Sequence, residues 1–382
     1  MSRNETVRHL HSAKKSKNDE FYTQLSDIEK ELKNYKNSFK GKVVLCNCDD
    51  PRVSNFFHYF SYNFEKLGLK KLISTCYKNQ KMDLFSKNDS ERAIYLEYEG
   101  DKNNNSVPDP EEIGIIHFEG DGDFRSEESI ELLKQADIVV TNPPFSLFRE
   151  YVAQLMEYEK QFLIIGNLNG MKYGDIYPYF QENRIWFGAT MFSGGAAYFI
   201  GSPELYDPEK MSNPKNAYIE DGKLYWRVNG VRWFTNLDHN KRHEELVLYA
   251  TYNPDDYPTY DNYDAIEVSK VVNIPMDFKG VMGVPISFMD KYNPDQFEII
   301  GLSMKAGFGL KSNKVYDSYK EIKQDGTFTR SSGKKTNGNP MLQGKPKKGN
   351  YYIDDEGNCA YSLYDRLFIV NKKYRDEYEN RT

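Results

Sequence analysis

An Asn-Pro-Pro-Phe sequence at residues 142–145 could do chemistry on an amino group. Pro143 offers a carbonyl acceptor without an N–H donor, and Asn142 adds a side-chain carbonyl on a backbone that the next proline stiffens. Two convergent acceptors suit an exocyclic amino group, and the flat ring of Phe145 suits stacking on a heterocycle. Such a turn could hold an amino nitrogen in line with an electrophile without a titrating base.

The flanking residues predict how this turn is positioned. Residues 138–140 are a β-branched run typical of a buried parallel strand, and the prolines end that run because they cannot donate to a ladder. Apolar residues then recur at helical spacing, at Leu147, Phe148, Tyr151 and Leu155. A strand, turn and helix in this order place the turn at the carboxyl end of a strand, where open α/β sheets bind ligands. This context favours a functional turn over one that merely ends a core strand.

The turn resembles the catalytic motif of amino-group methyltransferases that use S-adenosylmethionine (SAM). The longer run 141–151, with Lys-Asn-Asp-Glu-Phe-Tyr-Thr at 17–23, resembles the EcoRI-type adenine-specific DNA methyltransferases. The likeness covers most of the chain and is strongest over residues 17–200. It implies a SAM-dependent enzyme that methylates the N6 amino group of adenine at a specific site in duplex DNA. An adenine inside a duplex cannot reach a recessed turn, so the base must flip out.

The resemblance assigns roles to individual residues. Asn142 and Pro143 would accept hydrogen bonds from the adenine amino group, Pro144 belongs to the same motif, and Phe145 would stack on the ring. Phe21 and Thr23 would contact the methionine end of the cofactor. The full set of cofactor residues that it implies is Phe21, Tyr22, Thr23, Asn47, Asp49, Asp50, Pro51, Asp121, Asp123 and Asn142.

Some of these residues have simpler interpretations. Asp49 and Asp50 follow a predicted first core strand at 41–48, and they could bind the methionine amine or equally cap the helix predicted at 56–68. After a further predicted strand, Asp121 could accept from the adenine amino group of SAM or belong to an ordinary surface turn. The chain also departs from the usual pattern, because the turn after the first strand has no glycine and no acid ends the predicted second strand to hold the ribose.

From about residue 201 the sequence contains short strand-like runs without a long helix. Residues 305–348 are basic and rich in Gly, Ser and Asn, which predicts a flexible cationic loop suited to DNA phosphates, with a solvated linker as the alternative. The DNA-binding residues predicted from this segment are Lys311, Lys314, Arg330, Lys334, Lys335, Lys347 and Lys348.

Composition limits the class of protein. The 382 residues can bury a substantial core, and a net charge of −6 means that DNA binding must depend on local basic patches. Four cysteines fit a reducing compartment, and no run approaches the length of a membrane span. These features predict a cytoplasmic protein without a membrane segment. His239 and His243 lack a third ligand in reach, so no metal site is expected.

The predicted fold is α/β, with a Rossmann-like SAM-dependent methyltransferase sheet and a C-terminal mixed, β-rich target recognition region. We expect a flexible arm at 1–16, a SAM-binding catalytic domain at 17–200 and a DNA-binding recognition region at 201–382. The expected partner is duplex DNA, with a monomeric enzyme and functional pairing with a restriction endonuclease. Two alternatives stay open: a protein-glutamine methyltransferase, or a non-catalytic DNA-binding module with a degenerate SAM site.

Overall fold

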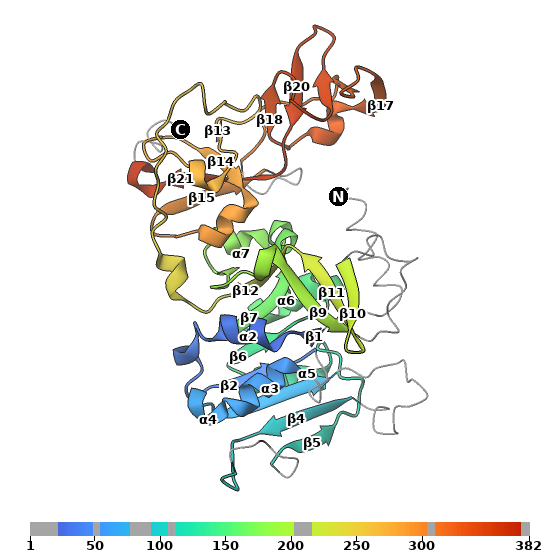
Figure 1. Cartoon of the computed structure of the whole chain (residues 1–382), viewed down its shortest axis with the longest axis vertical. Helices are drawn as coiled ribbons and strands as arrows, with labels where there is room; N and C mark the ends of the chain where they lie inside the picture. Colours follow the sequence, from blue (N-terminus) through green and yellow to red (C-terminus); the bar gives the residue numbers. More distant parts are fainter. Residues whose placement is uncertain are drawn as a thin grey trace. The chain divides into compact units, whose positions relative to one another are not determined.

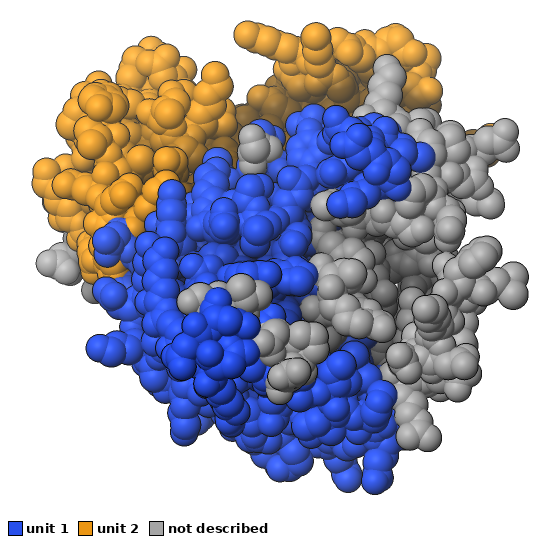
Figure 2. Space-filling model, turned by 60° about the horizontal axis from the view of Figure 1, so that its bottom comes forward, with its two compact units in different colours: residues 1–176, 185–240 blue, residues 177–184, 241–382 orange. Residues whose placement is uncertain are grey.

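The chain forms two compact units, which Figure 2 shows in separate colours. The first unit comprises residues 1–176 and 185–240, and the second comprises residues 177–184 and 241–382. This division differs from the predicted boundary at residue 200, because residues 217–235 form strands that pair with strands of the first unit. The computed structural model describes residues 22–48, 54–76, 93–105, 108, 112–201, 216–303 and 310–375. In these ranges no helix is long and apolar enough to cross a membrane.

A large mixed sheet is the framework of the first unit (Figure 1). Its four central strands run parallel, whereas the two strands on each side are antiparallel to their neighbours. The predicted α/β class is therefore confirmed, with parallel strands at the centre of the sheet. In sheet order the strands are β5 (Gly114–His117), β4 (Ile94–Tyr98), β3 (Lys71–Cys76), β2 (Val43–Cys46), β6 (Ile138–Thr141), β7 (Gln161–Asn167), β12 (Val231–Thr235) and β8 (Trp186–Phe187).

Two helices of this unit begin at serine N-caps: the Ser54 and Ser126 hydroxyls accept hydrogen bonds from the N–H groups of Phe57 and Ser129. The predicted helix at 56–68 consists of two helices joined at Asn63, and the second ends at Gly68, whose φ of 64° lies in the left-handed region that glycine tolerates. Large aromatic side chains such as Phe56, Phe60 and Trp233 are buried in the core. The helices are α2 (Leu25–Leu32), α3 (Asn55–Tyr62), α4 (Phe64–Leu67), α5 (Glu127–Gln135) and α6 (Phe148–Glu157).

A smaller sheet of the first unit contains the start of the described chain. Its order is β1 (Tyr22–Thr23), β9 (Ala196–Gly201), β11 (Lys223–Asn229) and β10 (Ala217–Glu220), all antiparallel. The buried carboxylate of Glu31 on α2 accepts hydrogen bonds from the Ala189 and Thr190 N–H groups, at 2.7 Å each. This contact ties α2 to the chain that leads into β9, so the segment that begins with β1 is held at both ends.

In the part that the structure describes, the second unit contains two further sheets, several 3₁₀ helices and one α-helix, α7 (Tyr177–Gln181). The first sheet has the order β13 (Ile266–Glu267), β14 (Met282–Pro285), β21 (Arg366–Asn371) and β15 (Phe297–Leu302). The buried Arg366 guanidinium of β21 donates to both carboxylate oxygens of Glu267 on β13, at 2.8 and 2.9 Å, and so links two strands that are not direct neighbours in the sheet. The second sheet has the order β17 (Phe328–Ser332), β16 (Lys320–Ile322), β19 (Tyr351–Ile353), β20 (Cys359–Ser362) and β18 (Met341–Gln343).

The prediction of a flexible loop at 305–348 is wrong for the part that the structure describes. Residues 310–348 supply three strands, β16, β17 and β18, of the second sheet. The segment folds because Tyr316, Tyr319 and Met341 form a small apolar cluster beneath its polar surface. The strand predicted at 361–370 is also divided, into the end of β20 and the start of β21.

Candidate active site

The Asn-Pro-Pro-Phe turn lies directly after β6, at the carboxyl edge of the parallel strands. Asn142 is half-buried, Pro143 is buried, and Phe145 begins a 3₁₀ turn, η3 (Phe145–Leu147), that leads into α6. The Leu147 N–H donates to the Pro144 carbonyl at 2.9 Å, which closes the turn. The predicted strand, turn and helix are all present, and the Phe145 ring is left half-buried rather than packed away in the core.

Asn47, at the end of the neighbouring strand β2, is hydrogen-bonded to both sides of this turn. The Thr141 hydroxyl donates to the Asn47 main-chain carbonyl, and the buried Tyr151 hydroxyl donates to the Asn47 side-chain oxygen. Thr141 precedes Asn142 in the chain, and Tyr151 lies in the first turn of α6. The end of the predicted cofactor strand is therefore bonded to the strand and helix that flank the turn.

Thr23 is brought to the same region by β1 and β9. The Asn55 side-chain amide, at the start of α3, donates to the Thr23 carbonyl at 2.6 Å. Thr23 lies opposite Phe199 in the small sheet, and the Phe199 ring is edge-to-face with Phe145 at a centroid distance of 6.3 Å. The Thr23 side chain is 2% exposed, and its hydroxyl makes no hydrogen bond to any residue that the structure describes. A buried hydroxyl of this kind is costly unless a ligand or water satisfies it.

The Gly/Asp-rich turn after β5 also reaches this edge of the sheet. A Cβ atom on Gly122 would lie 2.7 Å from the Cys76 carbonyl at the end of β3, so only glycine allows this approach. The Asp123 carboxylate accepts from both ends of the Arg125 guanidinium, at 2.8 and 2.7 Å, and these hydrogen bonds lower its pKa. Asp121 is exposed and accepts from the Asp123 N–H at 3.0 Å. Of the two acids, Asp121 is therefore the freer to meet a ligand.

Several residues predicted to bind the cofactor lie outside the described residues, and several residues that build the site were not predicted. Phe21, Asp49, Asp50 and Pro51 lie outside the described residues, and only the backbone of Tyr22 is described. Phe199, Asn55 and Tyr151 were missed as parts of the site, because each depends on pairing between distant segments. The aromatic spacing at 148 and 151 did signal a helix, but it could not show that the Tyr151 hydroxyl faces Asn47.

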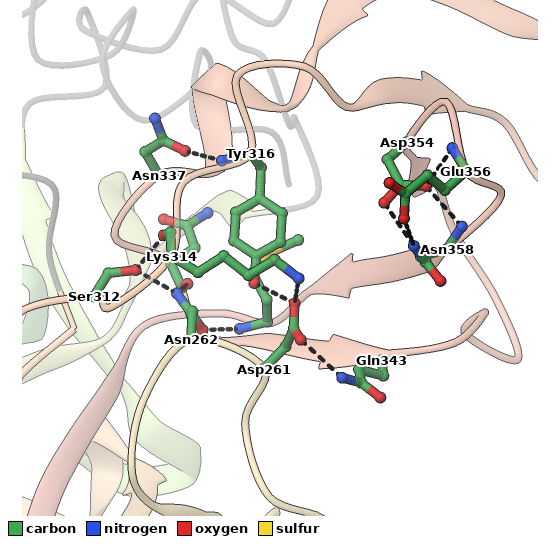
Figure 3. Close-up of polar contacts among 12 residues, drawn as sticks. Asp261, Asn262, Ser312, Lys314, Tyr316, Asn337, Gln343, Asp354, Glu356 and Asn358 are labelled. Carbon is green, nitrogen blue, oxygen red and sulfur yellow. Dashed lines mark hydrogen bonds and ion pairs between the residues drawn. The ribbon is translucent and has the colours of Figure 1, made fainter.

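The seven basic residues predicted to bind DNA divide into two groups. Lys314 is 2.8 Å from the Asp261 carboxylate, which also accepts from Tyr316 and Gln343 (Figure 3). The Lys335 ammonium lies 2.8 Å from the Glu321 carboxylate. Burial by itself would raise the pKa of Glu321, but hydrogen bonds from Lys335, Asn350 and Thr329 lower it to about 2. Among the described residues no ion pair involves the remaining five, which are all exposed: Lys311, Arg330, Lys334, Lys347 and Lys348.

The family model described as "Adenine-specific methyltransferase EcoRI" matches residues 9–363 of the chain. Type II methyltransferase M.EcoRI of Escherichia coli is 50% identical over 302 residues, which cover 78% of this chain and 90% of that protein. Type II methyltransferase M.MpnI of Mycoplasma pneumoniae is 42% identical over 296 residues, 77% of this chain and 85% of that protein. Type II methyltransferase M.MgeORF184P of Mycoplasma genitalium is 40% identical over 296 residues, covering 77% and 86%. No solved structure significantly matches the chain.

These relationships cover both units, including the strands beyond residue 201 that the amino-group motif alone does not explain. They bear out the resemblance seen in the two sequence motifs. They also favour a DNA adenine methyltransferase over the protein-glutamine methyltransferase that the Asn-Pro-Pro-Phe motif left open, because the matched family is described as adenine-specific. The chain belongs to the EcoRI family of adenine-specific methyltransferases, and it is a site-specific DNA adenine methyltransferase.

Proposed function

We propose that this enzyme transfers a methyl group from SAM to the N6 amino group of an adenine that is flipped out of duplex DNA. The observation that carries the proposal is the hydrogen-bonded connection of Asn47 to Thr141 and Tyr151. It joins the end of the predicted cofactor strand to the Asn-Pro-Pro-Phe turn. Together with the parallel centre of the large sheet, it supports a cofactor site and an amino-group site on one edge.

The residues of this edge fit SAM in chemical type. Thr23 presents a buried hydroxyl without a partner among the described residues, and Asp121 presents an exposed carboxylate. We assign these two side chains, with Asn47, to the cofactor, together with the predicted residues outside the described ranges. SAM, when bound, supplies a methyl group activated by a sulfonium. The chain's own contribution is to bind and orient the reactants at this edge.

The turn itself acts on the adenine amino group. The Asn142 side-chain oxygen and the Pro143 carbonyl accept its two N–H bonds, which draws electron density onto the nitrogen and fixes the direction of its lone pair. Phe145 stacks on the purine ring, and the buried Phe199 of β9 packs edge-to-face against the Phe145 ring and holds it in place. No side chain of the turn needs to titrate, because the amino nitrogen loses its extra proton to solvent after transfer.

In the second unit, we propose that the exposed basic residues of the β16–β18 region contact DNA phosphates as part of a target recognition region. Replacing Arg330, Lys334, Lys347 and Lys348 together by alanine should weaken binding to duplex DNA and reduce the slope of log K against log salt by about 3 to 4. Fluorescence anisotropy over a salt series measures both quantities. Lys335 is left unchanged, because its ion pair with Glu321 supports the fold.

A control for this test removes the same charge from the first unit. Lys33, Lys36, Lys40 and Lys66 are exposed on or beside its helices, and their replacement by alanine should leave the salt slope unchanged. If both quadruple variants lower the slope equally, the effect is one of net charge, and the phosphate contacts assigned to the second unit are wrong.

The function is tested most directly on whole genomes. We expect N6-methyladenine at one recurrent sequence in genomic DNA from a methylation-free bacterial host that expresses this protein, read by single-molecule sequencing. A host expressing the Asn142→Ala variant at the same level is the control. Unmodified DNA despite soluble protein would contradict the proposed methyl transfer.

We further propose that the enzyme acts as a monomer. Because the named relatives are Type II methyltransferases, we also propose that it is paired with a restriction endonuclease of the same target sequence.

A further inference from the structure

Strands β16 and β17 form a hairpin at one edge of the second sheet of the second unit, with β17 as the outermost strand (Figure 1). The Lys323 N–H donates to the Thr327 carbonyl at 2.9 Å and closes the connecting turn. Inside the turn, the Asp325 carboxylate accepts from the Thr327 N–H and hydroxyl, at 2.9 and 2.6 Å. The hairpin is therefore a two-stranded ribbon with a hydrogen-bonded turn at its tip.

The ladder between the two strands is irregular at its centre. Its ends pair as Lys320 with Ser332 and Ile322 with Phe328. Residues 329–331 of β17 therefore lie opposite a single residue of β16. Extra residues of this kind bend an edge strand and re-aim its side chains, and they are common beside functional sites.

Phe328 and Arg330 are the large side chains that this edge strand exposes. Phe328 is 65% exposed and Arg330 is exposed. Thr329, between them, is instead held by the sheet, because its hydroxyl donates to the buried Glu321 carboxylate at 2.7 Å. Neither the Phe328 ring nor the Arg330 guanidinium makes a hydrogen bond, ion pair or ring contact with any residue that the structure describes. A flat ring and a planar bidentate donor that the fold does not use are suited to recognising a partner.

The surroundings of the hairpin are positively charged. The Gln324 side-chain amide, in the hairpin turn, donates to the Lys347 carbonyl at 3.1 Å and so connects the turn to the segment 345–348. The exposed lysines of the turn and of this segment are Lys323, Lys345, Lys347 and Lys348. Such a group of cations attracts a polyanion. Because the chain is a DNA methyltransferase, we take duplex DNA as that polyanion.

We infer that the β16–β17 hairpin enters the major groove of the target DNA, where Arg330 and Phe328 contact base edges. The inference rests on the proposal that the second unit contacts DNA, and it adds sequence readout to those phosphate contacts. The major groove admits a two-stranded β-ribbon. The charge of Arg330 helps to attract the phosphates beside the groove, and its guanidinium then donates to O6 and N7 of a guanine. Phe328 packs against the C5 methyl group of a thymine.

The lysines beside the hairpin have a different role from Arg330. They meet phosphates, which positions the hairpin on the duplex but carries no sequence information. Replacing a base-reading side chain should therefore change which sequence is methylated, whereas replacing a phosphate-binding lysine should weaken binding to every sequence alike.

Arg330→Ala tests this difference against Lys347→Ala. The methylated motif of each variant and of the parent is read by single-molecule sequencing of DNA from a methylation-free bacterial host. Arg330→Ala should relax the motif at one G·C pair, where discrimination against other bases should fall by about 10- to 100-fold. Lys347→Ala should keep the whole motif and lower the salt slope of binding by about 1. An unchanged motif and unchanged discrimination in Arg330→Ala would overturn the inference.

Phe328→Ala is tested with DNA that contains uracil in place of thymine. Every target adenine is paired with a thymine, so the motif of the parent offers at least one position for the replacement, which removes only a methyl group. At one position the replacement should weaken binding by the parent about 4-fold, the effect of one buried methyl group, and Phe328→Ala should bind both duplexes equally. Equal sensitivity of parent and variant at every thymine, or no sensitivity in either, would refute the Phe328 contact.

Two controls in the second unit are matched to these side chains. Arg184 is an exposed arginine 4.9 Å from the Tyr179 ring, and Tyr249 is 80% exposed. Arg184→Ala and Tyr249→Ala should keep the motif of the parent, and a relaxed motif in either would overturn the assignment of readout to the hairpin. Arg330→Lys keeps the charge without the bidentate donor and should relax the motif as alanine does. Unmodified DNA from the parent refutes the proposed function, whereas a parental motif that Arg330→Ala and Arg330→Lys both retain refutes the hairpin alone.

Discussion

Asn142→Ala should lower methyl transfer to DNA by about a thousandfold while leaving the binding of SAM and of duplex DNA nearly intact. The variant removes one of the two acceptors proposed to hold the adenine amino group, and a lost preorganised hydrogen-bonding group of this kind costs about 10² to 10³ in rate. Asn142 is half-buried in a turn closed by its neighbours, so the fold should survive the change. Single-turnover transfer of a labelled methyl group, with saturating SAM and DNA, measures the chemical step.

Asn169→Ala is the control for this prediction. Asn169 is an exposed asparagine after β7, on the same edge of the large sheet, and its side chain makes no hydrogen bond to any residue that the structure describes. Its replacement should leave the single-turnover rate unchanged. A fully active Asn142→Ala variant would show that the turn positions the sheet rather than the amino group, and the catalytic assignment would be wrong.

The catalytic turn could be predicted from the sequence because its signals are local. A β-branched run, two prolines and a helical apolar pattern within about 20 residues each limit the backbone, and all three agree. The same is true of β2 and of the helix after it. The relation between Thr23 and Phe145 could not be predicted in this way, because it depends on pairing of β1 with β9, nearly 180 residues apart.

The basic segment at 305–348 shows the opposite case. Its composition is typical of a solvated loop, but two of its lysines form ion pairs with Asp261 and Glu321, and buried tyrosines supply the core. Asp261 lies about 50 residues earlier in the chain, so charge counting along the segment could not identify its pairing with Lys314. The structure thus separates the lysines whose ion pairs support the fold from the exposed lysines that we propose to contact DNA.

The other large effect is expected from Tyr151→Phe, which should lower kcat by about 10- to 100-fold with little change in KM for either substrate. The variant keeps the ring against Phe124 and removes only the hydroxyl that donates to the Asn47 side chain. Tyr151 touches neither reactant in this proposal, so it is a positioning residue. Without its hydrogen bond the end of β2 and the catalytic helix can shift, and a misplacement of about 1 Å can cost about 100-fold in rate.

Thr141 and Tyr177 provide the comparisons that separate positioning from general stability. Thr141→Val removes the second hydrogen bond to Asn47 and should lower kcat in the same way, whereas Thr141→Ser keeps the hydroxyl and should restore it. Tyr177→Phe removes a fully buried hydroxyl that has no hydrogen-bond partner among the described residues, so it should leave kcat unchanged and raise the melting temperature rather than lower it. If Tyr151→Phe alters the melting temperature but not kcat, Asn47 is held for stability alone. A fall in kcat in Tyr151→Phe and Thr141→Val, with rescue by serine, would instead mean that these two hydroxyls set the distance between the methyl donor and the adenine amino group.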